Sequence, residues 1–183
     1  MGGGAGVVKA GRWRSRILRP GGLAPDQCGS QGRRREWPAS DPRDPALTDQ
    51  YEDLQQSYGR CLRGGRFIER FYEVFMDSHP SVRPMFATTD MGTQRLALRR
   101  GISVAIFHAA GSALSRRTTE EMAQVHSCAG RSPVDPALYP YWVESLVQVV
   151  GETDPEATPA LLARWRAAME VVCGTFTRQY RAA

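Results

Sequence analysis

One of the three histidines in the chain lies where an imidazole could do chemistry. His126 closes the segment MAQVH, which reads as the end of a short helix, and it would face inward beside Met122 and Val125. A neutral imidazole is a common ligand of metal ions. A lone histidine is more often an ordinary core or surface residue, so its role depends on what the rest of the chain could place opposite it.

A second group of residues precedes His126 by about one long helix and a turn. Gln94 and Leu98 lie one helical turn apart, so an amide and an apolar side chain would face the same point. Gln94 and His126 are 32 residues apart, enough for a helix, a turn and a short helix back. Such a path would place them on opposite faces of a flat molecule. Taken alone, Gln94 could be a solvated helix residue.

The elements that would carry these residues all read as helices. Residues 48–62 give a weak first helix, and the segment GRFIERFYEVFMDSHP has the i, i+4, i+7, i+8 spacing of a buried helical face. A long helix is predicted from about residue 90 to 113. The helix that ends near His126 has Thr118 and Glu121 as a capping box at its start, and Gly130 follows its end.

Two further helices are predicted in the last third of the chain. Asp135 caps one that has Pro136 at its first position and runs to about residue 151. Thr158 and Pro159 repeat this start signal for the last helix. Its apolar stripe consists of Leu162, Trp165, Met169, Val172 and Phe176. We therefore expect an all-α domain of six or seven helices of unequal length.

Charge divides the chain into two parts. Residues 1–46 carry nine basic and four acidic side chains, whereas residues 47–183 carry fifteen of each, so the pI near 9.3 comes from the first part. Because this part is rich in Gly, Pro and Arg and lacks an apolar period, we expect a disordered basic extension over residues 1–46. Residues 47–183 would form one folded domain. A neutral domain argues against nucleic-acid binding.

The cysteines and the lack of long apolar stretches indicate the cellular compartment of the protein. The four cysteines, at positions 28, 61, 128 and 173, form no CxxC pair, which favours free thiols in a reducing compartment and argues against zinc. No stretch is long and apolar enough to span a membrane, and residues 1–46 hold no secretory signal. These features predict a cytoplasmic protein without a membrane partner.

Three segments together resemble one family. The order of the helices and the segments RFYEVFMDSHPSVRPMFATTDMGTQRLAL, MAQVHSCAG and VDPALYPYW are similar to globins, in particular to bacterial single-domain haemoglobins and the haem domain of flavohaemoglobins. The resemblance covers roughly residues 48–180. It implies the globin fold and haem b, iron protoporphyrin IX, as the cofactor.

The resemblance assigns roles residue by residue. His126 matches the proximal histidine that binds haem iron, and Phe86 matches the phenylalanine that packs against the porphyrin face. On the opposite side of the haem, Tyr72 and Gln94 match the distal hydrogen-bond donors to O2. Leu98 matches the apolar residue over the iron. Taken singly, Tyr72 and Phe86 would be ordinary core aromatics.

One part of the flavohaemoglobin pattern is missing. Tyr139 matches a tyrosine that lies near the proximal histidine in those proteins. The glutamate that bonds the proximal histidine there has no counterpart in the tail TRQYRAA, and Glu170 comes several turns too early. We therefore expect His126 to donate its ring N–H to a backbone carbonyl instead.

The resemblance also implies a function. It predicts reversible binding of O2, NO or CO at a five-coordinate iron, with tight O2 binding because two distal donors are present, and it assigns no catalytic residue. Two alternatives stay open: oxidation of NO with electrons from a separate reductase, and gas sensing through a partner. Because no flavin or nicotinamide domain is recognised in the sequence, we favour a binding protein over an enzyme.

Overall fold

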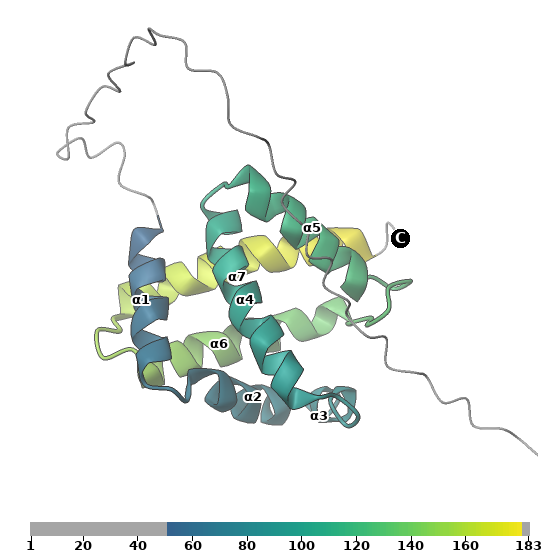
Figure 1. The fold of residues 1–183 in the computed structure, drawn as a ribbon, viewed down its shortest axis with the longest axis horizontal. Coiled ribbons are helices and arrows are strands. Elements are labelled where there is room, and N and C mark those ends of the chain that lie inside the picture. Colours follow the sequence, from purple (N-terminus) through teal and green to yellow (C-terminus); the bar gives the residue numbers. More distant parts are fainter. Residues whose placement is uncertain (1–50, 181–183) are drawn as a thin grey trace, which may run out of the picture. The chain divides into compact units, whose positions relative to one another are not determined.

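A computed structural model describes residues 51–180, so the extension predicted over residues 1–46 lies outside the described residues. Within the described part every regular element is a helix, which confirms the all-α prediction. The elements are α1 (Glu52–Arg63), α2 (Phe67–Ser78), α3 (Val82–Met85), α4 (Met91–Ala109), α5 (Ala113–His126), the 3-10 turn η2 (Pro136–Leu138), α6 (Tyr139–Thr153) and α7 (Pro159–Tyr180) (Figure 1).

The helices pack around one apolar core. α2 packs against α6, and α7 packs against α4, α5 and α6, with α4 crossing in front of α7 in Figure 1. The largest fully buried side chains include Phe67 and Phe71 of α2, Ile102 of α4, Leu146 of α6 and Trp165 of α7. The apolar spacing that predicted buried faces for α2 and α7 is thus the spacing at which these helices meet the core.

The boundary between α4 and α5 differs from its prediction. α4 ends at Ala109 and α5 begins at Ala113, so the capping box expected at Thr118 is wrong. Gly111 adopts a φ of +84°, which lets the chain reverse, and the Ser112 hydroxyl then accepts a hydrogen bond from the Ser115 N–H at 3.4 Å. Thr118 lies inside α5, where its hydroxyl donates to the Leu114 carbonyl. The Gly-Ser pair therefore starts the helix six residues earlier than predicted.

The start signal at Asp135 holds, but it opens a different element. The Asp135 carboxylate accepts a hydrogen bond from the Ala137 N–H at 2.9 Å, as predicted for a cap. The turn that it caps is η2, a single 3-10 turn, and α6 continues from Tyr139. The effect is to fix the direction in which the chain leaves the loop after His126.

A buried polar network joins α1 to the turn between α6 and α7. Arg60 donates to the Asp154 carboxylate at 2.5 and 2.8 Å, and Ser57 donates to it at 2.6 Å. The indole N–H of Trp165 donates to the Ser57 hydroxyl at 3.0 Å. Burial alone would raise the pKa of Asp154, but the hydrogen bonds from Arg60 and Ser57 outweigh it and hold that pKa at about 2. We call these four residues the Asp154 network.

Candidate functional site

His126 is the last residue of α5 and is half-buried. Its Nδ1 lies 2.8 Å from the carbonyl oxygen of Met122, one turn earlier. Because a carbonyl can only accept, this nitrogen carries the proton and donates, as the sequence predicted. Nε2 has no hydrogen-bond partner among residues 51–180. The hydrogen bond from Nδ1 therefore leaves Nε2 as the ring nitrogen available to bind a metal ion.

The loop after α5 holds the end of this helix in place. The N–H of Ser132 donates to the Val125 carbonyl at 3.0 Å, and the N–H of Val134 donates to the His126 carbonyl at 3.1 Å. At Gly130 the backbone passes so close that a Cβ would clash with the carbonyl oxygens of Gln124 and Val125. Only glycine fits there, which gives Gly130 a role in positioning His126 rather than only in ending the helix.

Phe176 of α7 links His126 to Tyr139. Its ring centroid lies 5.5 Å from that of His126 and 5.8 Å from that of Tyr139. The Tyr139 hydroxyl is buried and has no hydrogen-bond partner in the described part of the chain. Burial raises the pKa of Tyr139 above its ordinary value, and Cys173 adds to the effect. The two predicted residues thus share one aromatic neighbour, with Tyr139 left as an unsatisfied neutral phenol.

Tyr72 and Phe86, which the resemblance places beside the haem, are in contact with each other. Tyr72 of α2 is buried, and its ring centroid lies 5.6 Å from that of Phe86, which follows α3. The Tyr72 hydroxyl donates to the backbone carbonyl of Gln94 at 3.4 Å, a long hydrogen bond. Burial raises the pKa of Tyr72 to about 12, against the opposing effects of Gln94 and Arg95. Tyr72 is therefore a protonated donor with a weak partner.

Gln94, Leu98 and Gly101 follow one another along one side of α4. Gln94 and Leu98 are half-buried, and Leu98 packs against the core. A Cβ placed on Gly101 would meet no heavy atom within 4 Å. This side of α4 therefore combines one amide with an apolar side chain and leaves open space at Gly101, which suits a flat, mainly apolar ligand.

The donor set fits haem. An imidazole with a free Nε2 on α5 suits the iron, and Phe86 and Leu98 offer apolar contacts to a porphyrin. Within the described residues no ion pair involves His126. The nearest charge to Tyr72 is Arg95, which pairs with Glu69. The arrangement would bind a ligand through one axial nitrogen and apolar burial.

The other two histidines lie in different surroundings. His79 packs against Tyr141, with the ring centroids 4.8 Å apart. His108, at the end of α4, lies 3.5 Å from the Thr175 hydroxyl through Nε2, while its buried Nδ1 has no partner within residues 51–180. Burial lowers the pKa of His108, Glu120 opposes this effect, and Arg116 and Arg178 reinforce it. Among residues 51–180, neither histidine forms a hydrogen bond or ring contact with a predicted site residue.

Three residues beside His126 carry no specific signal in the sequence. Met122 supplies only its carbonyl, and any residue type could do so at that position. The sequence predicts Gly130 only as the residue that follows the helix, and Phe176 only as one member of the apolar stripe of α7. Only the helical spacing of four residues between Met122 and His126 could have indicated the carbonyl acceptor in advance.

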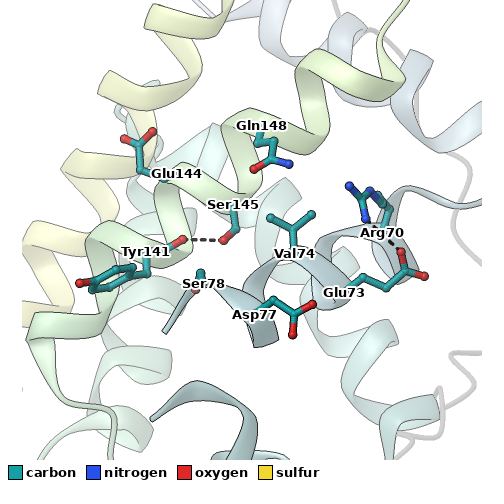
Figure 2. Close-up of a pocket in the computed structure, with 9 residues that line it drawn as sticks. All are labelled: Arg70, Glu73, Val74, Asp77, Ser78, Tyr141, Glu144, Ser145 and Gln148. Atoms are coloured by element: carbon teal, nitrogen blue, oxygen red, sulfur yellow. Dashed lines mark hydrogen bonds and ion pairs between the residues drawn. The ribbon is translucent and has the colours of Figure 1, made fainter. Parts of the chain in front are cut away.

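A groove lies between α2 and α6 (Figure 2). Its volume is about 380 Å³, and none of the predicted site residues lines it. Its polar groups are occupied locally: Arg70 pairs with Glu73 and Glu152, and the Ser145 hydroxyl donates to the Tyr141 carbonyl at 2.7 Å. The groove lies where two helices cross, and Arg70 and Ser145 in its lining already have partners within the domain.

Comparison with known proteins places the fold. No family model and no curated protein matches the chain. Among solved structures it is similar to a protein from Pseudomonas aeruginosa PAO1 that is described as structurally highly homologous to a human hemoglobin. The two are 32% identical, the match covers 71% of this chain and 97% of the other, and the TM-score is 0.67. Within the described residues, no helix is long and apolar enough to cross a membrane.

Proposed function

The chain belongs to the globin family, and on this premise we propose that it binds haem b through His126 and takes up O2, NO or CO on the opposite face. The globin fold implies haem binding. The observation that carries the choice of His126 is the hydrogen bond from its Nδ1 to the Met122 carbonyl, which leaves Nε2 free to bind iron. When bound, haem supplies an iron atom with one axial position for a diatomic ligand.

The remaining residues would surround the porphyrin and the diatomic ligand. Phe86 and Leu98 would pack against the ring, and Tyr139, through Phe176, would support the side of His126. Tyr72 would give up its 3.4 Å hydrogen bond to the Gln94 carbonyl and donate to the ligand, with the Gln94 amide as a second donor. A hydrogen bond to a charged group contributes about 1.5–3 kcal/mol, which corresponds to about 10- to 100-fold slower ligand loss.

The test of the haem site substitutes His126 and uses the same substitution of His79 as its control. Full-length protein reconstituted with hemin should bind one haem and show a Soret band. His126→Ala should lose stoichiometric haem, and added imidazole should partly restore it, whereas His79→Ala should retain haem. Tyr72→Phe should keep haem and release O2 about 10- to 100-fold faster. A normal ferrous spectrum in His126→Ala would assign the iron to another ligand.

A second candidate function is the oxidation of NO by the O2-loaded protein, with a separate reductase. The neutral, buried Tyr72 hydroxyl favours it, because the same donor that retains O2 would stabilise developing negative charge. Mixing O2-equilibrated protein with NO separates the two functions. One stoichiometric event indicates a binding protein, and sustained NO consumption with added reductant indicates an enzyme. A gas sensor would instead require a partner that responds to the ligand.

A further inference from the structure

Charge is distributed unevenly over the described domain. Residues 51–180 carry fourteen arginines and fourteen acidic side chains, yet residues 91–117 carry five arginines and no acidic residue. This segment comprises α4, the turn at Gly111 and the start of α5. Its arginines are Arg95, Arg99, Arg100, Arg116 and Arg117. Like charges gathered in one segment repel one another, so the stability of the fold alone does not explain them.

Most of this charge is not neutralised within the domain. Arg95 pairs with Glu69 at 3.5 Å and Arg117 with Glu121 at 3.2 Å, but Arg99, Arg100 and Arg116 have no ion-pair partner among residues 51–180. Arg116 also lies in the first turns of α5, where a positive charge opposes the helix dipole. Arg99, Arg100 and Arg116 therefore gain no stabilisation from ion pairs within the described domain.

Large apolar side chains are exposed between these arginines. Leu96 is 59% exposed and Phe107 is 43% exposed, and both lie on the side of α4 that also carries Arg100, away from the buried Ile102. Leu114, just after the turn, is 79% exposed. We define the basic–apolar face by four residues of α4: Leu96, Arg99, Arg100 and Phe107. Apolar contacts framed by cations are typical of a protein docking surface.

We propose that the basic–apolar face docks an acidic protein that delivers single electrons to the haem. Charge complementarity selects an acidic partner and excludes a second copy of the same face, which would meet it with like charge. Exposed Leu96 and Phe107 favour a protein over a nucleic acid, whose phosphates offer no apolar surface. Recognition of an acidic protein follows from the face itself.

The role of electron donor rests on the proposed function. α4 also carries Gln94 and Leu98, so a carrier docked on its outer side would be separated from the proposed haem by one helix thickness, about 10 Å. In the transfer the carrier is oxidised by one electron and ferric iron is reduced to ferrous iron. No bond forms or breaks, and no proton has to move.

A titration tests docking independently of haem. The probe is a plant-type [2Fe–2S] ferredoxin, an acidic one-electron carrier, titrated by calorimetry into full-length protein with and without haem. It should bind both forms, more weakly as salt increases. Arg100→Glu should weaken binding about tenfold or more. Arg166→Glu is the control, because it makes the same charge change at an exposed arginine on α7 that pairs with Glu144. It should leave binding within about twofold.

Two further measurements decide the outcome. Reduction of the ferric protein by reduced ferredoxin should be about tenfold slower in Arg100→Glu, whereas reduction by dithionite should be unchanged. Equal weakening by Arg100→Glu and Arg166→Glu, or no binding, overturns the docking face. Ferredoxin-independent binding to phosphatidylserine vesicles that is lost in Arg100→Glu would assign the face to a membrane instead. If haem fails to bind but ferredoxin still docks, the electron-donor role and the haem proposal fail while the docking face stands.

Discussion

The two ends of α7 solve the problem of buried polar groups in opposite ways. At its beginning, the Asp154 network closes on itself: the carboxylate, the guanidinium, the hydroxyl and the indole N–H are all hydrogen-bonded, and the Asp154 side chain is fully buried. Near its end, the Tyr139 hydroxyl, the Gln179 amide oxygen and His108 Nδ1 are all buried without partners within the described residues. Beside them His126 keeps a free Nε2.

This contrast separates a part of the molecule whose buried polar groups are satisfied from a part where they are not. A buried charge pair is costly unless every group is satisfied, and the Asp154 network meets that condition without any ligand. Unsatisfied groups are costly too, and they are expected where function rather than stability selects the residues. The unsatisfied groups at the end of α7 beside His126 are therefore consistent with the haem site that we propose there.

The largest predicted effect comes from opening the Asp154 network. Asp154→Ala leaves Arg60, whose side chain is 11% exposed, with only the exposed Glu156 as an ion-pair partner among residues 51–180, and removing one partner of a buried pair costs about 3–5 kcal/mol. Chemical denaturation of the haem-free protein should show a loss in that range. Glu144→Ala, which breaks the exposed pair with Arg166, should cost at most about 1 kcal/mol. Equal effects of the two substitutions would mean that the network contributes no more than a surface pair.

The sequence predicted one of these two regions much better than the other. The haem-binding roles of His126 and Tyr139 stay predictions, but one contact of this region is confirmed. The backbone acceptor of His126 could be predicted because the segment MAQVH and the missing glutamate are local features of the sequence. The Asp154 network could not, because Ser57 and Arg60 are separated from Asp154 by more than ninety residues and carry no pattern of their own. Contacts between distant segments depend on how the helices cross, which periodicity does not determine.

The predicted start of α5 was wrong for a different reason. Thr118 and Glu121 have the capping-box spacing, but Gly111 and Ser112 provide a turn and a cap six residues before Thr118. Two start signals compete there, and the one that follows a chain reversal prevails because α5 must return along α7. The helical prediction itself holds, since the stripes in α2 and α7 report on burial directly.

Lowering the pH should destabilise the two regions in different ranges. The pKa of Asp154 is about 2 in the folded state, against an ordinary value near 3.9, so its contribution is present above pH 4 and is lost as the pH falls toward 2. The loss is on the order of 2 kcal/mol. The folded pKa of His108 is lowered, so stability should begin to fall earlier, below about pH 6.5.

Denaturation of the haem-free protein at a series of pH values measures both ranges. His108→Gln should remove the decline that begins below pH 6.5 and leave the decline below pH 4. Asp154→Asn should be less stable at neutral pH and should lose the decline below pH 4. A single decline that neither substitution alters would place the acid sensitivity of the domain in other groups.

The smallest predicted effect gives the clearest test, because one hydroxyl is removed from each region and the resulting changes in stability should differ in sign. Ser57→Ala removes an acceptor from the buried Trp165 N–H and a donor to Asp154, which should cost about 1–3 kcal/mol. Tyr139→Phe removes a buried hydroxyl that has no partner in the described chain, so the haem-free protein should be unchanged or more stable by up to about 1 kcal/mol. If the Tyr139 hydroxyl gains a partner when haem binds, the same substitution should weaken haem retention, whereas Ser57→Ala should not. A loss of stability in haem-free Tyr139→Phe would show that this hydroxyl is already satisfied, and the contrast between the two ends of α7 would then rest on His108 and Gln179 alone.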